Sequence, residues 1–509
     1  MRCLRTYVVL TLLILSACAT PPSPSDMRIV ETEAGRIRGE HSDGMFVFRG
    51  VPYAAPPEGA LRWRAPDPVK PWQGERDATQ FSADCMQNRM SGDLGVSAQA
   101  VSEDCLYLNV WSARPSSEAL MPVMVWIHGG GFVGGSGAAK IMDGAALARR
   151  GVVLVTFNYR LGRFGFFAHP ALTAEAGDGA TANWGLLDQI AALQWVKHNI
   201  AAFGGDPGNV TIFGESAGGE SVNRLMSSPK AAGLFHKAIA ASGGGRDAWP
   251  TLAVAEAKGE AFAAKAGALS DAASLRAIPA SEVMGGITLM AKDDARYSGP
   301  VTDGKLVTDR ADTLFKQGRA AAVPYIVGAN SDELAMIPAG MRKMANGMMT
   351  APIKPHIDAV LAAYGAPEVM ERRVAGDVTF VEPARAMAVR HAAAGARTFL
   401  YSFGYVAESA RSPDAGAGHA TDVPYQFDTL AAAISLPTAQ DEAAADLVAS
   451  YWTNFAKTGD PNGPGLPHWP AVNLSAPMML SIGSQKVEAV SANAAEIVAI
   501  AAARDEEGK

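Results

Sequence analysis

The chain has 509 residues, of which 48% are hydrophobic and 19% are charged, so it carries enough apolar material for a large folded core. Its formal net charge is −7 and it contains no run of basic residues, which argues against nucleic acid as a partner. No segment after the N-terminal apolar run has the length and apolarity of a membrane span.

The N-terminal segment has the pattern of an export signal. Two arginines precede an apolar run from Tyr7 to Leu15, and small residues follow it. The end of this run, "LSAC", is similar to a bacterial lipobox, which would make Cys18 the lipid-modified first residue of the mature protein. The alternative is ordinary cleavage after the small residues 17–19, which would release a soluble protein.

The signal divides the chain into three parts. We expect residues 1–18 to be a signal peptide and residues 19–27 to be a Pro/Ser-rich tether that cannot pack. Residues 28–505 are expected to form one catalytic domain. The expected location is the outer membrane, through a lipid anchor, or the periplasm of a Gram-negative bacterium.

Two cysteines remain outside the export segment, namely Cys85 and Cys105. In an exported chain, two cysteines that close a loop of about twenty residues fit a disulfide, which would contribute roughly 3 kcal/mol to stability. The alternative is a pair of unpaired, buried thiols.

The middle of the chain predicts an α/β fold with a mostly parallel central sheet flanked by helices. Continuous apolar runs, typical of strands covered on both faces, occur at residues 122–127, 152–159, 210–214, 237–242, 324–330 and 398–403. Between the second and third runs, residues 183–203 carry apolar side chains at helical spacing, which predicts a strand, helix, strand unit. The Ala-rich stretch from about 250 to 400 predicts further helices packed over the sheet.

The sequence "TIFGESAGGE", residues 211–220, places Ser216 between Gly214 and Gly218. Gly-X-Ser-X-Gly is the nucleophile elbow, a sharp turn from strand to helix in which only glycines tolerate the close approach of neighbouring chain. The flanks agree with this reading, because an apolar run precedes the motif and a helical pattern follows it. Ser216 is therefore the candidate nucleophile.

A glycine-rich loop, "HGGG", follows the strand predicted at 122–127. It leaves the backbone N–H groups of Gly130 and Gly131 free to point at a ligand, and it is similar to the oxyanion loop of lipases and esterases. The remaining donor of such a site is the amide after the nucleophile, here Ala217. A phosphate-binding loop is the alternative, but neither GxGxxG nor a GK[ST] ending is present. We expect no cofactor and no metal.

Five histidines follow Ser216, and only one has the setting expected of a base. In a triad built on such an elbow, the acid and then the histidine follow the serine along the chain. His419 lies on a Gly/Ala-rich loop after a β-run and is our candidate base, whereas His236, His356, His391 and His468 lack this context. Asp332 and Glu333 both follow the strand at 324–330, and spacing alone does not choose the acid between them.

These motifs resemble the type-B carboxylesterase/lipase family, the cholinesterase-like branch of the α/β-hydrolases. The resemblance covers residues 28–485 and rests on "FRGVPYAAPPEGALRWRAP", "SEDCLYLNVW", "WIHGGGF", "TFNYRLGRFGFF", the long block around Ser216, and "GANSDE". It implies the α/β-hydrolase fold with helical insertions over the active site, and a serine carboxylesterase with Glu333 as the acid and His419 as the base.

The resemblance also implies structural roles. It implies a Cys85–Cys105 disulfide and two buried ion pairs, Arg49 with Glu103 and Arg160 with Asp188. Glu215, next to the nucleophile, resembles the family's glutamate at the floor of the gorge and is not expected to be catalytic.

Departures from the family pattern limit the substrate. Residues 86–104 contain no aromatic residue, so the cation–π site of the cholinesterases is missing and choline esters are poor candidates. Asp293, Asp294 and Arg296 fall where the acyl pocket is expected, and their desolvation would oppose a long alkyl chain. We expect esters with short- to medium-chain acyl groups on a fairly apolar alcohol. The alternatives are an inactive α/β-hydrolase binding module, or an amidase or thioesterase on the same triad.

Overall fold

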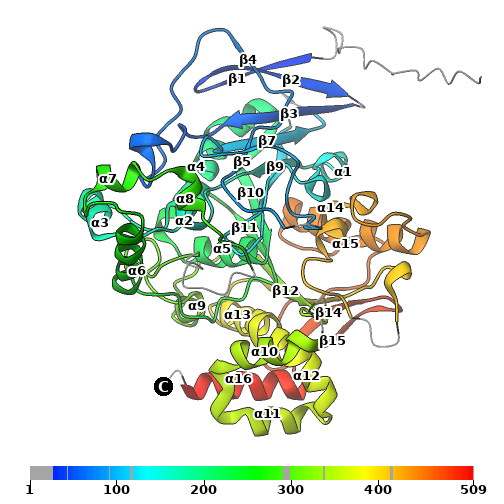
Figure 1. Cartoon of the computed structure of the whole chain (residues 1–509). Helices are drawn as coiled ribbons and strands as arrows, with labels where there is room; N and C mark the ends of the chain where they lie inside the picture. The colour runs from blue at the N-terminus through cyan, green and yellow to red at the C-terminus, as the bar shows by residue number, and fades with distance from the viewer. Residues whose placement is uncertain are drawn as a thin grey trace, which may run out of the picture.

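The structure is a computed structural model that describes residues 27–507 apart from 43, 91, 115–118, 290–298, 336, 338 and 413–415. Its centre is a sheet of thirteen strands that runs through the molecule (Figure 1). Twelve of them follow the spatial order β1-β2-β3-β7-β9-β8-β10-β11-β12-β13-β14-β15, and β4 pairs with β2 beside this path. The strands are β1 Met27–Thr32, β2 Gly35–Ser42, β3 Met45–Pro52, β4 Glu75–Asp77, β7 Tyr107–Ser112, β8 Met121–Ile127, β9 Val153–Phe157, β10 Gly205–Glu215, β11 Lys237–Ala241, β12 Tyr325–Asn330, β13 Thr398–Gly404, β14 Met478–Gly483 and β15 Val487–Ser491.

The centre of the sheet is parallel, and the pairings at its ends are antiparallel apart from the parallel pair of β2 and β4. All pairings from β9 to β14 are parallel, and the six apolar runs picked out in the sequence are β8 to β13. The prediction of a mostly parallel sheet is therefore confirmed. The expected strand, helix, strand unit is also present: α4 connects β9 to β10, and β8 lies between these two strands in the sheet.

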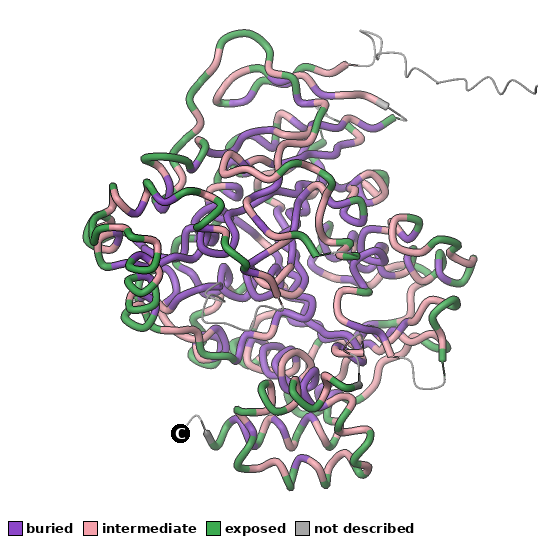
Figure 2. The backbone as a smooth tube through the Cα atoms, viewed as in Figure 1, coloured by how far each residue is buried: buried purple, intermediate pink, exposed green. Residues whose placement is uncertain are grey.

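Helices cover both faces of the sheet, which separates two cores. One core includes Leu193 of α4 and Val222 of α5, and the other includes Leu147 of α1 and Trp452 of α15. Figure 2 shows buried chain concentrated along the sheet and exposed chain on the outer helices. The helices are α1 Ala145–Arg149, α2 Gly162–Gly165, α3 Pro170–Ala176, α4 Trp184–Asn199, α5 Ala217–Met226, α6 Leu252–Lys265, α7 Ala272–Arg276, α8 Ala280–Met284, α9 Ala311–Lys316, α10 Ala339–Met349, α11 Ile357–Tyr364, α12 Pro367–Gly376, α13 Glu382–Ala393, α14 Val423–Phe427, α15 Ala439–Thr458 and α16 Ala495–Glu507.

A separate group of helices lies at one end of the molecule, where α10, α11, α12 and α16 pack together (Figure 1). They share a small core that includes Ile353, Val360 and Ile500. Among the helices in the described ranges, none is long and apolar enough to cross a lipid bilayer.

Candidate active site

Ser216 occupies a strained turn between β10, which ends at Glu215, and α5, which begins at Ala217. Its backbone has φ 56° and ψ −122°, a combination that side-chain-bearing residues rarely adopt. Its N–H donates a hydrogen bond to the Ala241 carbonyl at the end of β11, 3.0 Å away, which holds the turn against the sheet. The turn therefore fixes the serine in one place.

The glycines of the elbow are required by packing. A Cβ on Gly218 would lie 1.9 Å from the Ile127 carbonyl oxygen, and one on Gly214 would lie 2.5 Å from the carbonyl carbon of Gly218. No side chain fits at either position, so the two glycines allow α5 to approach β8 closely behind the serine.

The glycine-rich loop that the sequence marked as a candidate oxyanion loop follows β8 at the same edge of the sheet. Gly130 and Gly131 have φ values of 97° and 60°, which favour glycine. The Gly130 carbonyl accepts the N–H groups of Val133 and Gly134, each at 3.1 Å, so the loop turns back on itself. The N–H groups of Gly130, Gly131 and Ala217 donate no hydrogen bond to any other described residue, which leaves them available to a ligand.

Ser216, Ala217 and Gly131 line one cavity of about 330 Å³. Three aromatic rings and Leu289 also line this cavity, and the rings belong to Phe132, Trp249 and Phe380. The candidate nucleophile and two of the free amides thus face a space large enough for a small substrate.

His419 is held by the carboxylate of Glu333. The Nδ1 atom of His419 lies 2.6 Å from Glu333 Oε2, and the His419 N–H donates to the Glu333 carbonyl at 2.9 Å. The second carboxylate oxygen, Oε1, accepts the backbone N–H of Asn330 at 2.7 Å and the hydroxyl of Ser242 at 2.6 Å. The Glu333 side chain is fully buried, so its orientation is fixed on every side.

Asp332 points in another direction. Its Oδ2 lies 3.4 Å from Arg372 Nε on α12, and its N–H donates to the Ala417 carbonyl. Of the two carboxylates that spacing left open, Glu333 is therefore the one that meets His419.

Phe380 connects His419 with the cavity. Its ring lies against the imidazole with centroids 4.6 Å apart, and Phe380 also lines the cavity of Ser216. Phe380 belongs to η7 (Asp377–Val381), a single π-helical turn between α12 and α13. Within the described residues no hydrogen bond joins the Ser216 hydroxyl to His419, a contact that commonly tightens only when substrate binds.

Glu215 lies beside the other nitrogen of the imidazole, with Oε1 3.3 Å from His419 Nε2. Burial raises the pKa of Glu215 to about 8. Burial alone would lower the pKa of His419, but the charges of Glu215 and Glu333 outweigh it and raise that pKa to about 10. Because a protonated Glu215 no longer attracts the imidazolium, the two groups titrate as a coupled pair.

Comparison with known proteins identifies the family. The sequence model of the Carboxylesterase family matches residues 26–351 and 369–499. The chain belongs to the carboxylesterase family. It is similar to the fumonisin B1 esterase of Sphingopyxis macrogoltabida, 36% identical over 93% of this chain and 90% of that protein, and to carboxylesterase 1E of Rattus norvegicus, 34% identical over 91% of each.

Solved structures of carboxylesterases agree with this assignment. Carboxylesterase EST55 of Geobacillus stearothermophilus superposes with a TM-score of 0.79 at 34% identity, covering 93% of this chain and 99% of that one. A PNB esterase superposes with a TM-score of 0.80 at 32% identity and the same coverage. The chain is thus an enzyme with the α/β-hydrolase fold, as the sequence motifs predicted.

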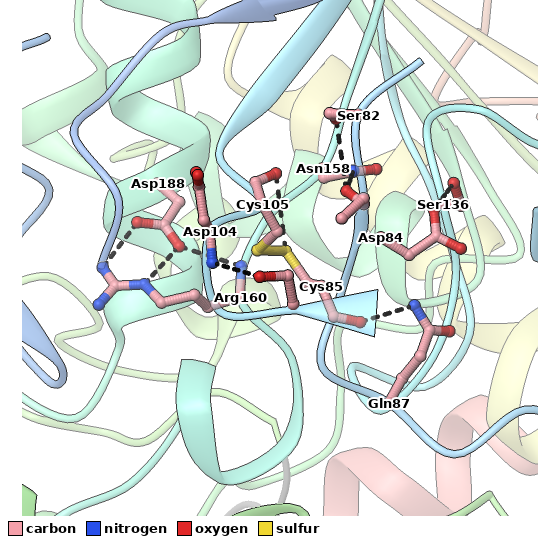
Figure 3. Close-up of a disulfide and its surroundings, with 12 residues drawn as sticks. Ser82, Asp84, Cys85, Gln87, Asp104, Cys105, Ser136, Asn158, Arg160 and Asp188 are labelled. Carbon is pink, nitrogen blue, oxygen red and sulfur yellow. Dashed lines mark hydrogen bonds and ion pairs between the residues drawn. A yellow bond between two sulfur atoms is a disulfide. The ribbon is translucent and has the colours of Figure 1, made fainter. Parts of the chain in front are cut away.

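A disulfide lies beside the glycine-rich loop of this carboxylesterase. Cys85 and Cys105 are bonded, and Cys85 begins the segment that leads to Gln87. The Gln87 amide donates to the Cys85 carbonyl at 3.1 Å (Figure 3). It also donates to the Gly135 carbonyl at 2.8 Å and accepts the Gly135 N–H at 2.9 Å. Gln87 therefore fixes the chain just after the oxyanion glycines, a role that no sequence motif signalled.

Of the two ion pairs expected from the sequence, the Arg160–Asp188 pair is present, whereas the prediction of an Arg49–Glu103 pair is wrong. Arg160 and Asp188 form a buried bidentate pair at 2.7 and 2.8 Å (Figure 3). Glu103, however, pairs with Arg62 at 2.5 Å, while Arg49 pairs with Glu40 at 2.7 Å.

The difference follows from the sheet and from burial. Arg49 lies on β3 beside β2, the strand that carries Glu40. Arg62 is 6% exposed, and its guanidinium also donates to the carbonyls of Arg276 and Ile278 at 3.1 and 2.5 Å. The more deeply buried arginine takes the carboxylate of Glu103, because a buried charge needs a partner more than a surface charge does.

Some of the predicted residues lie outside the described part of the chain. They are Cys18 in the export segment and Asp293, Asp294 and Arg296 in the expected acyl-pocket segment. The predictions made for these four residues therefore remain predictions.

Proposed function

We propose that this carboxylesterase hydrolyses esters of short- and medium-chain carboxylic acids through an acyl-enzyme on Ser216. The observation that carries the proposal is the buried Glu333–His419 contact beside the cavity that Ser216 lines. A serine hydroxyl is a poor nucleophile at neutral pH, so it needs a neighbouring base and a group that orients that base.

Each step of the reaction has a residue to support it. Ser216 Oγ attacks the ester carbonyl while His419 Nε2 takes the hydroxyl proton, and the carbonyl oxygen becomes an oxyanion facing the amides of Gly130, Gly131 and Ala217. The C–O bond to the alcohol then breaks, and His419 returns the proton to the departing alkoxide. A water molecule, deprotonated by His419, attacks the acyl-enzyme and releases the acid and free Ser216.

Glu333 stabilises the imidazolium that forms twice in each cycle. Its Oε1 is occupied by Ser242 and Asn330, so the carboxylate cannot rotate and its Oε2 stays on Nδ1 of His419. This arrangement leaves Nε2 as the only nitrogen of the ring available for proton transfer.

Substitution and labelling of the serine test the proposal together. Ser216→Ala is expected to lower kcat for p-nitrophenyl butyrate by about 10⁶-fold, since triad members act as a unit. An organophosphate should label the wild type on the peptide that holds Ser216, as read by mass spectrometry. The matched control is the exposed Ser475, whose change to alanine should leave both activity and labelling intact. An active Ser216→Ala enzyme, or an adduct on another residue, contradicts the proposal.

A further inference from the structure

The cavity of Ser216 has an acidic, aromatic wall that begins at the first turn of α5. We propose that this wall binds a protonated primary or secondary amine carried by the ester substrate, through Glu220, Asp247 and Trp249. The inference rests on the function proposed above and adds a substrate class to it.

Among the described residues that line the cavity, the charged groups are both acidic. Among its described lining residues the ones with ionisable side chains are Glu220 and Asp247, and no lysine or arginine is present. Their cationic partners come from outside the cavity. Arg224 Nε holds Glu220 Oε1 at 2.6 Å, and Arg504 Nη2 holds Asp247 Oδ1 at 3.1 Å, but neither arginine lines the cavity.

Glu220 presents one unoccupied oxygen to the cavity. The residue is 7% exposed, and its Oε1 accepts Arg224 Nε and the Trp249 indole N–H at 2.6 and 3.0 Å. Its Oε2 accepts no hydrogen bond from the described residues. A Cβ built on Gly244, which also lines the cavity, would lie 3.9 Å from Oε2, so this oxygen is on the cavity side.

The Glu220 side chain is largely removed from solvent, and its Oε2 has no donor among the described residues. Burial raises the pKa of Glu220 despite the nearby charge of Arg224, because burial disfavours the ionised form. An ammonium N–H placed at Oε2 would supply the missing hydrogen bond, and the bond would be charge-assisted.

The rings around the carboxylates suit the same ligand. The indole of Trp249 is fixed by its bond to Glu220 and packs edge-on against Phe132, with centroids 5.8 Å apart. Aromatic faces next to carboxylates favour cations over anions, and the half-exposed Asp247 adds a second negative charge. Because Glu220 Oε2 needs a donor, the site favours an amine with N–H groups over a quaternary ammonium, which has none.

Isosteric ester pairs test the proposal directly. Ethyl piperidine-4-carboxylate and ethyl cyclohexanecarboxylate differ by NH₂⁺ for CH₂ in the acyl part, and piperidin-4-ylmethyl and cyclohexylmethyl butyrate differ in the same way in the alcohol. We expect the charged ester of one pair to have a kcat/KM at least about tenfold higher than its neutral partner, after correction for their hydroxide-catalysed rates. The N,N-dimethylated, quaternary version of that ester should lose most of the gain.

Variants assign the effect to the wall. Glu220→Gln should lower the charged-to-neutral ratio by about tenfold or more, and Asp247→Asn, on a half-exposed side chain that tolerates change, should lower it in the same direction. Glu175→Gln removes an acid that pairs with Arg64 and Arg276 on the surface and is expected to leave the ratio unchanged.

The outcomes separate this inference from the proposed function. A ratio at or below one in both pairs, an equal gain for the quaternary ester, or a ratio that neither wall variant changes overturns the amine site. Failure of the enzyme to hydrolyse any of the four esters, neutral ones included, would instead count against the proposed ester hydrolysis.

Discussion

The carboxylate of Glu215 lies 3.3 Å from Nε2 of His419, on the nitrogen opposite the one that Glu333 holds. In the mechanism proposed here, Nε2 is the atom that must accept the proton of Ser216. A negative charge at this distance stabilises the protonated imidazole and so raises the pKa of His419. Glu215 thus influences the pH range of the enzyme without touching the ester carbonyl.

We predict that Glu215→Gln extends activity to lower pH. The base acts only when His419 is neutral, so activity falls as the pH drops through the His419 pKa. Removing the charge of Glu215 lowers that pKa, and the acidic limb of kcat/KM should move down by about 1–2 pH units. The measurement is a pH–rate profile with p-nitrophenyl butyrate, with Glu175→Gln as a control for loss of a distant carboxylate. A limb that stays in place or moves upward would show that Glu215 is not charged when substrate binds.

We predict that Glu333 and Asp332 respond differently to loss of charge. Glu333→Gln should lower kcat by about 10³–10⁴-fold, because the amide cannot stabilise the imidazolium and can hold the wrong tautomer. Asp332→Asn should keep kcat within about tenfold, since Asp332 faces Arg372 rather than His419. Steady-state kinetics on purified variants decide between them, and a more damaging Asp332→Asn would reverse the assignment of the acid.

Residues of the site that depend on backbone geometry could be predicted from the sequence more readily than contacts between side chains. Ser216 was predicted because Gly214 and Gly218 are demanded by backbone packing, and such demands leave a fixed spacing in the chain. His419 was predicted from its glycine-rich loop and its order after Ser216. Asp332 and Glu333 are adjacent, so only the direction of each side chain in the folded protein separates them.

Other features of the fold and the site left no recognisable pattern in the nearby sequence. The three arginines at 49, 62 and 64 lie close together in the chain, and which of them meets Glu103 depends on burial created by a segment more than 200 residues away. Gln87 and Phe380 take their roles from tertiary packing alone. The outermost strands of the sheet, β1 and β15, were missed because they are only partly buried and lack the continuous apolar runs of β8 to β13.

We predict that Arg246 is a major contributor to stability. The Arg246 side chain is 4% exposed, and its guanidinium contacts Glu382, Asp312 and Asp505. Arg246→Met would leave buried carboxylates with too few partners and should lower the free energy of unfolding by about 3–5 kcal/mol. Arg64→Met removes an exposed pair with Glu175 and should cost less than about 1 kcal/mol. Urea unfolding followed by circular dichroism measures both, and equal losses would contradict the role of burial.

We predict a maximum in acyl-chain length at about two to eight carbons. The cavity of about 330 Å³ is comparable to the smaller ligand pockets of proteins. A series of p-nitrophenyl esters from C2 to C16 gives the profile in kcat/KM. A steady rise to C16, or activation by emulsified triglyceride, would indicate a true lipase instead.

We predict lipid attachment at Cys18, on the sequence pattern of the N-terminal segment. Radiolabelled palmitate fed to expressing Gram-negative cells should enter the wild type and not Cys18→Ser, and the labelled protein should fractionate with the outer membrane. A wild type that stays unlabelled in the periplasmic fraction would favour ordinary cleavage.

The position of α16 makes one wall of the cavity depend on a helix that follows the whole sheet in the chain. Arg504 and Asp505 on this helix hold Asp247 and Arg246, so one wall of the cavity takes its ion pairs from residues translated after every strand of the sheet. Until α16 is made, Arg246 lacks one of its carboxylates and Asp247 lacks its arginine. The cavity wall that carries Asp247 therefore gains its last ion pairs only after every strand of the sheet has been translated.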